Sequence, residues 1–206
     1  MKKVVVIGAT GNTGAYLVDD FCSSLNRGEY EVVAAGRRST DFFERYGIDY
    51  ASVDISDPST LEALPKNDVF AVVLLAGILP AYMSGYEPSR YLDVNSRGAL
   101  NVLEYCRNVN ADRILYAQTI SDVLGSVTPD NPIIHPYADR SIIMTGDHTV
   151  YALSKCFAVD LIRHYHAEYG VKGFVFRLPT VYAYTPDKTY NVDGVRRTLG
   201  YRLLMR

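Results

Sequence analysis

Cysteine is scarce in this chain, and the few cysteines that occur exclude two kinds of stabilisation. The 206 residues include three cysteines, Cys22, Cys106 and Cys156, which stand far apart and lack the spacing of a metal site. Three isolated cysteines do not make a disulfide framework. The sequence therefore predicts reduced thiols in a core or a helix, no metal centre and an intracellular compartment.

Long hydrophobic runs and an excess of charge of one sign are also lacking. No apolar stretch reaches the ~18 residues that a membrane-spanning helix needs, and the formal net charge is −2. A nearly neutral chain offers no positive surface for nucleic acid or an anionic membrane. The first strand pattern begins almost at once and leaves no room for a signal peptide. We expect a cytoplasmic protein without nucleic-acid or membrane partners.

Alternating strand and helix patterns predict the fold. Hydrophobic residues make up 48% of the chain, enough to bury a substantial core. The alternation is typical of a doubly wound α/β Rossmann fold with a mainly parallel sheet. The patterns predict strands near residues 3–8, 31–36, 48–53, 69–76, 113–118 and 172–178. They predict helices near 12–26, 40–46, 58–64, 88–108 and 148–169, and a long loop over 125–147.

A glycine-rich turn follows the first apolar run directly. Residues 3–7 form a β-branched strand pattern, and a helical pattern begins after the glycines. This order is that of a dinucleotide phosphate site: Gly8 permits a tight turn, Gly11 lets the backbone approach a pyrophosphate, and Gly14 allows close helix–strand packing. The N–H groups at the start of the helix would face the phosphates. The predicted phosphate site comprises Gly8, Thr10, Gly11, Asn12, Thr13 and Gly14.

Tyr151 and Lys155 stand four residues apart in a segment of strong helical periodicity, so they share one face of a helix. A tyrosine hydroxyl titrates near pH ~10, which is too high for proton exchange at neutral pH. A neighbouring ammonium group would lower the tyrosine pKa and make the phenol an acid–base catalyst. An exposed pair on a helix surface has the same spacing, so the pattern gains its meaning from the glycine turn.

These motifs, in this order, resemble those of the extended short-chain dehydrogenase/reductase superfamily, of the NAD(P)-dependent epimerase/dehydratase type. The superfamily's G-x-x-G-x-x-G pattern is matched by residues 8–14, and its catalytic pair by Tyr151 and Lys155. The resemblance implies hydride transfer at a secondary alcohol or ketone, with Tyr151 exchanging the proton of the substrate oxygen. It also implies that Lys155 hydrogen-bonds the nicotinamide ribose.

Four further motifs of the superfamily have counterparts in this chain. Asp54-Ile55 corresponds to its acidic residue after the third strand, which contacts the adenine. Leu75-Ala76-Gly77 resembles its small-residue turn after the fourth strand, and Val94-Asn95-Ser-Arg-Gly98 its Val-Asn-x-x-Gly signature. Arg177-Leu-Pro179 is similar to its segment after the sixth strand. The cofactor residues implied beyond the glycine turn are Asp54, Ile55, Leu75, Ala76, Gly77, Asn95, Tyr151, Lys155 and Pro179.

The catalytic hydroxyl departs from the superfamily pattern. The Ser-Ser-x-x-Val-Tyr-Gly segment reads here as residues 118–125, which places Ile120 at the usual hydroxyl position. Thr119 precedes it and Ser121 follows it, and we favour Thr119 as the group that holds the substrate oxygen near Tyr151. The alternative is that both hydroxyls only satisfy backbone groups at the strand end.

The substrate segment departs as well. Thr180 stands where nucleotide-sugar members commonly carry an asparagine, and Ala183 replaces a glycine. A nucleotide sugar is the leading substrate class; a simple ketone reductase and a dinucleotide-responsive binding protein without turnover are the alternatives. We expect residues 1–178 to form the NAD(P)-binding domain. Residues 179–206 would begin a truncated or minimal substrate-binding region, with a helix opening at residues 193–206.

Two arginines predict the choice of cofactor. The end of the second strand reads Ala35-Gly36-Arg37-Arg38, at the place where an acidic residue would hold the ribose hydroxyls of NAD. Guanidinium groups suit the extra phosphate of NADP through charge and paired donors. We therefore expect NADP in preference to NAD; a solvated arginine pair at a strand end is the alternative.

The helices predicted at 88–108 and 148–169 resemble the pair that forms a four-helix dimer interface in the superfamily. Each helix needs one face for the sheet, and a two-fold dimer would cover a second apolar face. The expected partners are therefore a small-molecule substrate and a second copy of the chain.

Overall fold

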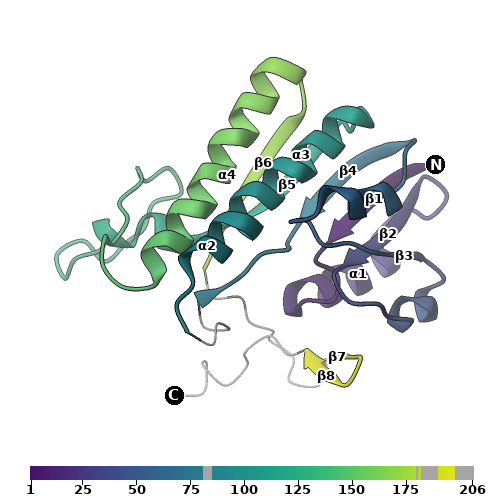
Figure 1. Cartoon of the computed structure of the whole chain (residues 1–206), viewed down its shortest axis with the longest axis horizontal. Coiled ribbons are helices and arrows are strands. Elements are labelled where there is room, and N and C mark those ends of the chain that lie inside the picture. The colour runs from purple at the N-terminus through teal and green to yellow at the C-terminus, as the bar shows by residue number, and fades with distance from the viewer. Residues whose placement is uncertain (81–84, 180, 182–189, 198–206) are drawn as a thin grey trace.

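Six parallel strands form the central sheet, in the order β3-β2-β1-β4-β5-β6 (Figure 1). The computed structural model describes residues 1–80, 85–179, 181 and 190–197. The strands are β1 (Lys2–Ile7), β2 (Tyr30–Gly36), β3 (Asp49–Ser52), β4 (Val69–Leu74), β5 (Arg113–Thr119) and β6 (Lys172–Leu178). The strand order reverses between β1 and β4, where open α/β sheets form their ligand crevice. The predicted doubly wound Rossmann fold is confirmed.

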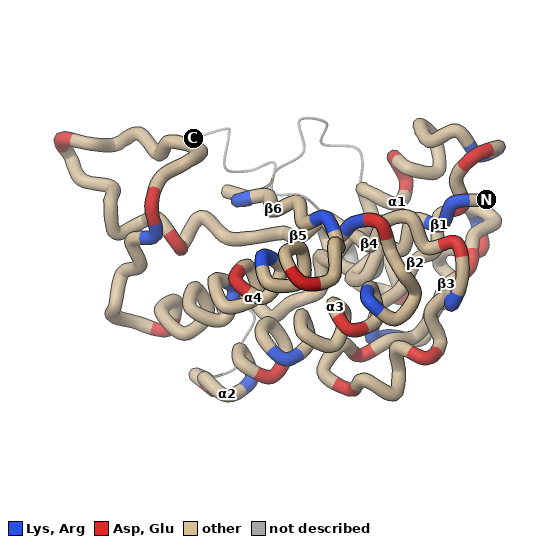
Figure 2. Tube along the Cα trace, turned by 90° about the horizontal axis from the view of Figure 1, so that it is seen from above, with Lys and Arg blue, Asp and Glu red and all other residues tan. Residues whose placement is uncertain are grey.

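Helices cover both faces of the sheet because alternate residues of each central strand point to opposite sides. Val4 and Val6 of β1 join a buried cluster with Ala15 and Val18 of α1 (Asn12–Ser24). The other face joins a second cluster with α3 (Gly98–Asn108) and α4 (His148–Tyr169), which lie side by side (Figure 2). β1 is therefore buried on both sides, as its unbroken β-branched sequence predicts.

Two segments predicted as helices contain only short 3₁₀ turns. The segment at 40–46 holds a turn over Phe42–Tyr46, and the segment at 58–64 holds one over Pro58–Ala63. Gly47, with a φ of 61°, ends the first turn. Asp57 opens the second by accepting a hydrogen bond from the Ser59 N–H at 3.0 Å. Segments of five and six residues are too short to sustain an α-helix without tertiary support.

The helix predicted at 88–108 is continuous but irregular. α2 (Pro88–Tyr91) leads into a π-helical turn over Leu92–Arg97, and α3 follows without a break. The bounds of α4 agree with the predicted 148–169. The predicted loop at 125–147 is largely without regular structure, apart from a 3₁₀ turn over Leu124–Ser126 and a single bridge between Thr128 and Asn131.

The helix predicted to open at residue 193 is wrong in the part that the structure describes. β7 (Tyr190–Val192) and β8 (Val195–Arg197) form an antiparallel hairpin instead. Asp193 and Gly194 connect them with φ angles of 52° and 76°. An Asp-Gly pair is among the best sequences for a two-residue hairpin turn, and this local preference outweighs the helical pattern. Residues 198–206 lie outside the described residues.

Candidate functional site

The turn after β1 brings backbone together where side chains would not fit. Gly8 has a φ of 98°, and a Cβ there would lie 2.6 Å from the Ala76 nitrogen. A Cβ on Gly14 would lie 2.2 Å from the Gly8 oxygen, so α1 packs directly against the turn. Gly11 is the N-cap of α1 and makes no side-chain cap, so the N–H groups of Asn12 and Thr13 begin the helix uncapped. Such a helix start favours an anion.

A cavity of about 220 Å³ opens beside this turn, at the carboxyl ends of β1, β2 and β4. It gathers predicted cofactor residues from four separate stretches of the chain. Those that line it are Gly8, Thr10, Gly11, Arg37, Arg38, Asp54, Ile55, Leu75, Ala76 and Gly77. Four lining residues were missed by the sequence analysis, namely Gly36, Val53, Ile78 and Val94. Each of the four is adjacent in sequence to a predicted residue, so extending the predicted motifs by one residue would have found them.

Arg37 and Arg38 form the cationic end of this cavity. Both side chains are exposed, and neither guanidinium forms an ion pair with any residue in the described part of the chain. The Tyr50 hydroxyl holds the backbone beside them, because its proton is shared between the carbonyl oxygens of Gly36, at 2.9 Å, and of Arg38. Two unpaired cations on a fixed backbone are suited to bind a phosphate.

Lys155 lies in the core of the protein, beneath the turn after β4. Its side chain is buried, and its Nζ lies 4.1 Å from the centroid of the Tyr116 ring. The same Nζ lies 4.0 Å from the position that a Cβ on Gly77 would occupy, so Lys155 borders the cavity wall. Burial lowers the pKa of Lys155 to about 7, because the apolar surroundings disfavour its charged form.

Tyr151 is buried one helical turn before Lys155, and the structure brings Thr119 to it. Burial raises the pKa of Tyr151, while a hydrogen bond with the Thr119 side chain opposes the rise. Ser121 contacts Thr119 instead: the Thr119 Oγ1 accepts a hydrogen bond from the Ser121 N–H at 3.1 Å. The raised pKa differs from the sequence expectation, because the Lys155 ammonium lies over Tyr116 and burial dominates at Tyr151.

Asn95 holds the backbone of Ile78, which lines the cavity, through hydrogen bonds. Its Oδ1 accepts a hydrogen bond from the Ile78 N–H at 2.9 Å, and its Nδ2 donates to the Ser154 Oγ at 3.2 Å. The Ser96 hydroxyl donates to the Ser154 carbonyl oxygen at 3.2 Å. Asn95 and Ser96 are adjacent in sequence, and the π-helical turn lets both side chains face α4. Neither Ser96 nor Ser154 was predicted from the sequence, where the signal for each is a small polar residue among apolar helix positions.

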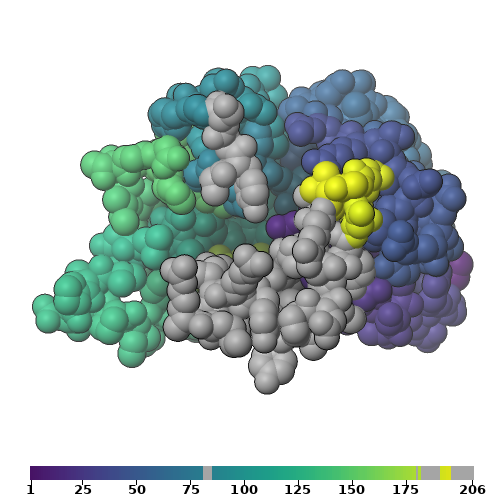
Figure 3. Space-filling model, turned by 90° about the horizontal axis from the view of Figure 1, so that it is seen from below, coloured from purple at the N-terminus to yellow at the C-terminus, as the bar shows by residue number. Residues whose placement is uncertain are grey.

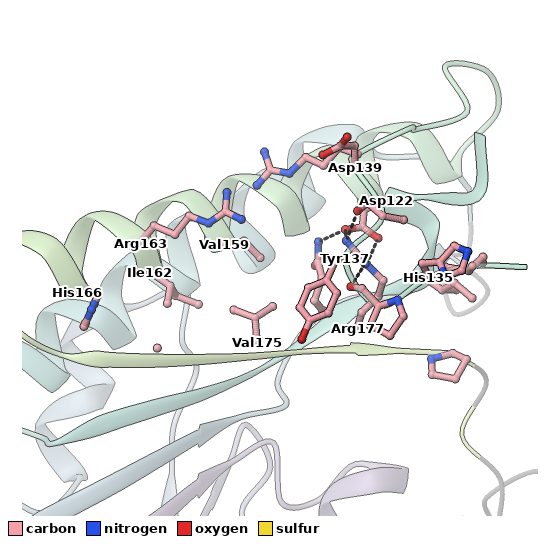
Figure 4. Close-up of a pocket in the computed structure, with 18 residues that line it drawn as sticks. Asp122, His135, Tyr137, Asp139, Val159, Ile162, Arg163, His166, Val175 and Arg177 are labelled. Atoms are coloured by element: carbon pink, nitrogen blue, oxygen red, sulfur yellow. Dashed lines mark hydrogen bonds and ion pairs between the residues drawn. The ribbon is translucent and has the colours of Figure 1, made fainter. Parts of the chain in front are cut away.

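A second and larger cavity, of about 1220 Å³, lies between α4, β6 and the loop at 134–140 (Figure 4). The buried Asp122 carboxylate accepts hydrogen bonds from the Arg177 Nε at 2.9 Å and Nη2 at 3.1 Å. Arg177 also donates to the Pro136 carbonyl oxygen at 2.9 Å, which fastens the loop to β6. Pro179, predicted as a cofactor residue, lines this second cavity and not the one beside the glycine turn.

No group of three metal-ligating side chains is arranged for a metal ion in the described part of the chain. None of the helices among the described residues is long and apolar enough to cross a membrane. Cys106 and Cys156 are buried and Cys22 is partly buried, and all three are free thiols.

Comparison with known proteins finds relatives among enzymes of sugar chemistry. The model of the NAD dependent epimerase/dehydratase family matches residues 4–199. A UDP-glucose 4-epimerase of Mus musculus is 27% identical over 177 residues, which cover 79% of this chain and 48% of that protein. An L-arabinose 1-dehydrogenase (NAD(P)(+)) of Haloferax volcanii is 27% identical over 190 residues, which cover 86% of this chain and 66% of that protein.

A solved structure shows the same fold. The UDP-glucose 4-epimerase of Thermus thermophilus, crystallised in complex with NAD, superposes with a TM-score of 0.70 at 26% sequence identity. The match covers 88% of this chain and 56% of that one. This chain therefore spans about half to two thirds of the length of these relatives.

The residues around the smaller cavity fit a nicotinamide dinucleotide. A turn that excludes side chains meets the start of α1, where a pyrophosphate would lie. The exposed Arg37 and Arg38 stand at one end of the cavity, and Lys155 borders Gly77 in its wall. Together with the family model, which matches residues 4–199, this geometry establishes that the chain belongs to the NAD dependent epimerase/dehydratase family.

Proposed function

We propose that the chain carries the dinucleotide-binding and proton-transfer site of an oxidoreductase that acts on a secondary alcohol or ketone, with a nucleotide sugar as the substrate class. Two observations carry this proposal: Tyr151 contacts the Thr119 side chain, and Lys155, one helical turn later on α4, borders Gly77 in the cavity wall. A protein that only sensed a dinucleotide would not need a buried phenol and a buried amine at that place. The substrate class rests on the UDP-glucose 4-epimerase relatives.

Each residue of the site has a separate task in this proposal. The first turn of α1 and the glycine turn would hold the pyrophosphate of NADP or NAD, and the bound dinucleotide would supply the hydride carrier. Thr119 orients the substrate oxygen, and the Tyr151 hydroxyl gives or takes its proton. Lys155, at the cavity wall, would donate a hydrogen bond to the nicotinamide ribose. Asn95 keeps the Gly77–Ile78 backbone in the position that this arrangement requires.

Calorimetry with NADP and NAD, followed by a steady-state screen of nucleotide sugars and simple ketones, tests this function. We expect binding of a dinucleotide and turnover of at least one nucleotide sugar. Binding without turnover across the screen would favour a non-catalytic dinucleotide-responsive protein. Absence of binding would contradict the site itself.

We also propose that NADP is preferred to NAD, because the Arg37 and Arg38 guanidinium groups stand at the cavity end without an ion-pair partner among the described residues. Replacing both arginines by alanine should weaken NADP binding by at least tenfold, or ~1.4 kcal/mol, and change NAD binding little. Calorimetric titration of each cofactor measures the two affinities. Arg107→Ala with Arg163→Ala is the control, since those exposed arginines lie on α3 and α4 and do not line the smaller cavity. An equal loss for both cofactors would show that the pair does not read the extra phosphate.

A homodimer through the helical layer is the proposed assembly. Leu92, Leu153 and Phe157 are 50%, 41% and 53% exposed, although they are large and apolar. They belong to the π-helical turn and to α4, which pack against each other. Leu153→Glu with Phe157→Glu should convert a dimer into a monomer in sedimentation velocity, because two charges would be buried at the interface. Ile133→Glu, on an exposed loop, should leave the dimer intact; a wild-type chain that sediments only as a monomer would contradict the proposal.

A further inference from the structure

The β7–β8 hairpin is anchored on the segment that follows β2. Val192 is completely buried and belongs to the same cluster as Phe42 and Phe43. The Thr40 hydroxyl donates a hydrogen bond of 2.6 Å to the Asp193 carboxylate, and it accepts one of 3.0 Å from the Phe42 N–H. In Figure 3 the hairpin, in yellow, lies against this segment, in dark blue. A turn that is 153 residues away in sequence is therefore fixed beside the end of β2.

This anchoring brings Asp193 to the segment that follows the two arginines. Thr40 lies two residues after Arg38, so the hydrogen bond holds Asp193 beside the short stretch of chain that carries the arginine pair. The Tyr50 hydroxyl, whose single proton is shared between the carbonyl oxygens of Gly36 and Arg38, interacts electrostatically with both the Asp193 carboxylate and the Arg38 guanidinium. Burial raises the pKa of Tyr50 to about 12, the Asp193 carboxylate adds to the rise, and the Arg38 guanidinium opposes it. The carboxylate and the guanidinium therefore act on the same small region of the protein.

We propose that Asp193 is a specificity-determining residue, whose carboxylate opposes the binding of a 2′-phosphate at Arg37 and Arg38 and so limits the preference for NADP over NAD. The inference deepens the proposed function and rests on dinucleotide binding in the smaller cavity. Its physical basis is repulsion: a phosphate dianion that approaches the two guanidinium groups also approaches a fixed carboxylate. A ribose that carries only hydroxyls meets no such repulsion. The end of β2 lacks an acidic residue, and the hairpin supplies one from the other end of the chain.

Asp193→Asn is the decisive variant, because asparagine retains the oxygen that accepts the Thr40 hydrogen bond and tolerates the positive φ of 52°. Calorimetry with adenosine 2′,5′-bisphosphate and with 5′-AMP separates the 2′-phosphate from the rest of the nucleotide. We expect the bisphosphate to bind about three- to tenfold more tightly than to the wild type, and 5′-AMP to bind unchanged. High salt should reduce the gain, because screening weakens interactions between exposed charges.

Two further variants make the result specific. Asp130→Asn removes an exposed carboxylate from the loop at 125–147 and should change neither affinity. Thr40→Val removes the hydroxyl that holds Asp193 and should raise the ratio of bisphosphate to 5′-AMP affinity in the same direction as Asp193→Asn.

An unchanged ratio in Asp193→Asn would overturn the inference, and so would an equal change for both nucleotides, which would make the hairpin a general support. Failure of the wild-type chain to bind either nucleotide would instead remove the proposed function, and the inference with it. A higher ratio in Asp193→Asn, absent from Asp130→Asn, supports the assignment.

Discussion

Replacing Tyr151 by phenylalanine should lower turnover by ~10²–10⁴-fold and leave dinucleotide affinity nearly unchanged, because a positioned acid–base group contributes about that much. The ring is buried, and it packs edge-on against Tyr91 with the ring centroids 6.0 Å apart. Phenylalanine preserves this packing and removes only the hydroxyl that meets Thr119. Steady-state kinetics on the substrate identified by the screen, with calorimetry for the cofactor, measure the two quantities separately.

Tyr91→Phe is the matched control for this substitution. It removes a second buried phenol from the same pair of rings, but that phenol has no task in the proposed chemistry. Its turnover should stay close to that of the wild type. The turnover of Thr119→Val should lie between those of Tyr151→Phe and Tyr91→Phe, since this substitution removes the group that orients the substrate oxygen. Full turnover in Tyr151→Phe would end the catalytic assignment and favour a dinucleotide-binding protein without turnover.

Replacing Lys155 by methionine should stabilise the cofactor-free protein below about pH 7 by a few kcal/mol. Burial lowers the pKa of Lys155 from 10.5 to about 7, so the unfolded chain holds a proton that the folded chain releases between these values. Stability therefore rises with pH across this range, and below it the folded protein carries a buried charge. Methionine fills a similar volume without that charge, so its advantage is full at about pH 6 and fades toward about pH 10.

Urea unfolding of the cofactor-free protein at about pH 6, 8 and 9.5 measures this trend. Lys66→Met, at an exposed lysine that pairs with Glu62, should show no comparable dependence on pH. A Lys155→Met variant that is less stable than the wild type at the lowest of these pH values would contradict the buried-charge argument. The same variant should bind the dinucleotide more weakly, because the hydrogen bond to the ribose is lost. A gain in stability with a loss of binding is the signature of a residue kept for function.

The sequence predicted the sheet well because its signals are local and strong. The β-branched run at residues 3–7 and the glycines after it admit few other arrangements, and the start of α4 at residue 148 and its end at 169 follow from its periodicity. The hairpin at 190–197 was missed because the pattern after residue 193 reads as helical, whereas the Asp193-Gly194 turn decides the local structure. Short-range turn chemistry outweighed a longer pattern.

The sequence indicated many of the residues at the candidate site, but it did not indicate the pKa shifts of Tyr151 and Lys155. Spacing placed Tyr151 and Lys155 on one helix face, but spacing carries no information about depth, and depth sets both pKa values. The same limit applies to Pro179, which belongs to a segment that resembles a cofactor motif but lines the larger cavity in the structure. Asn95 and Ser154, which tie the cavity wall to α4, come from segments 59 residues apart, so only the fold reveals their contact.

The π-helical turn at Leu92–Arg97 changes which side chains of this helix face its neighbours before and after the turn. A π-helical turn contains one residue more than the α-helical turn it replaces, and one residue corresponds to a rotation of about 100°. α3 can therefore face the sheet while Tyr91, just before the turn, faces Tyr151. Deleting a single residue within 92–97 would make the helix regular and rotate its first part away from α4. We therefore expect this helix to tolerate substitution on its exposed side far better than a change in length.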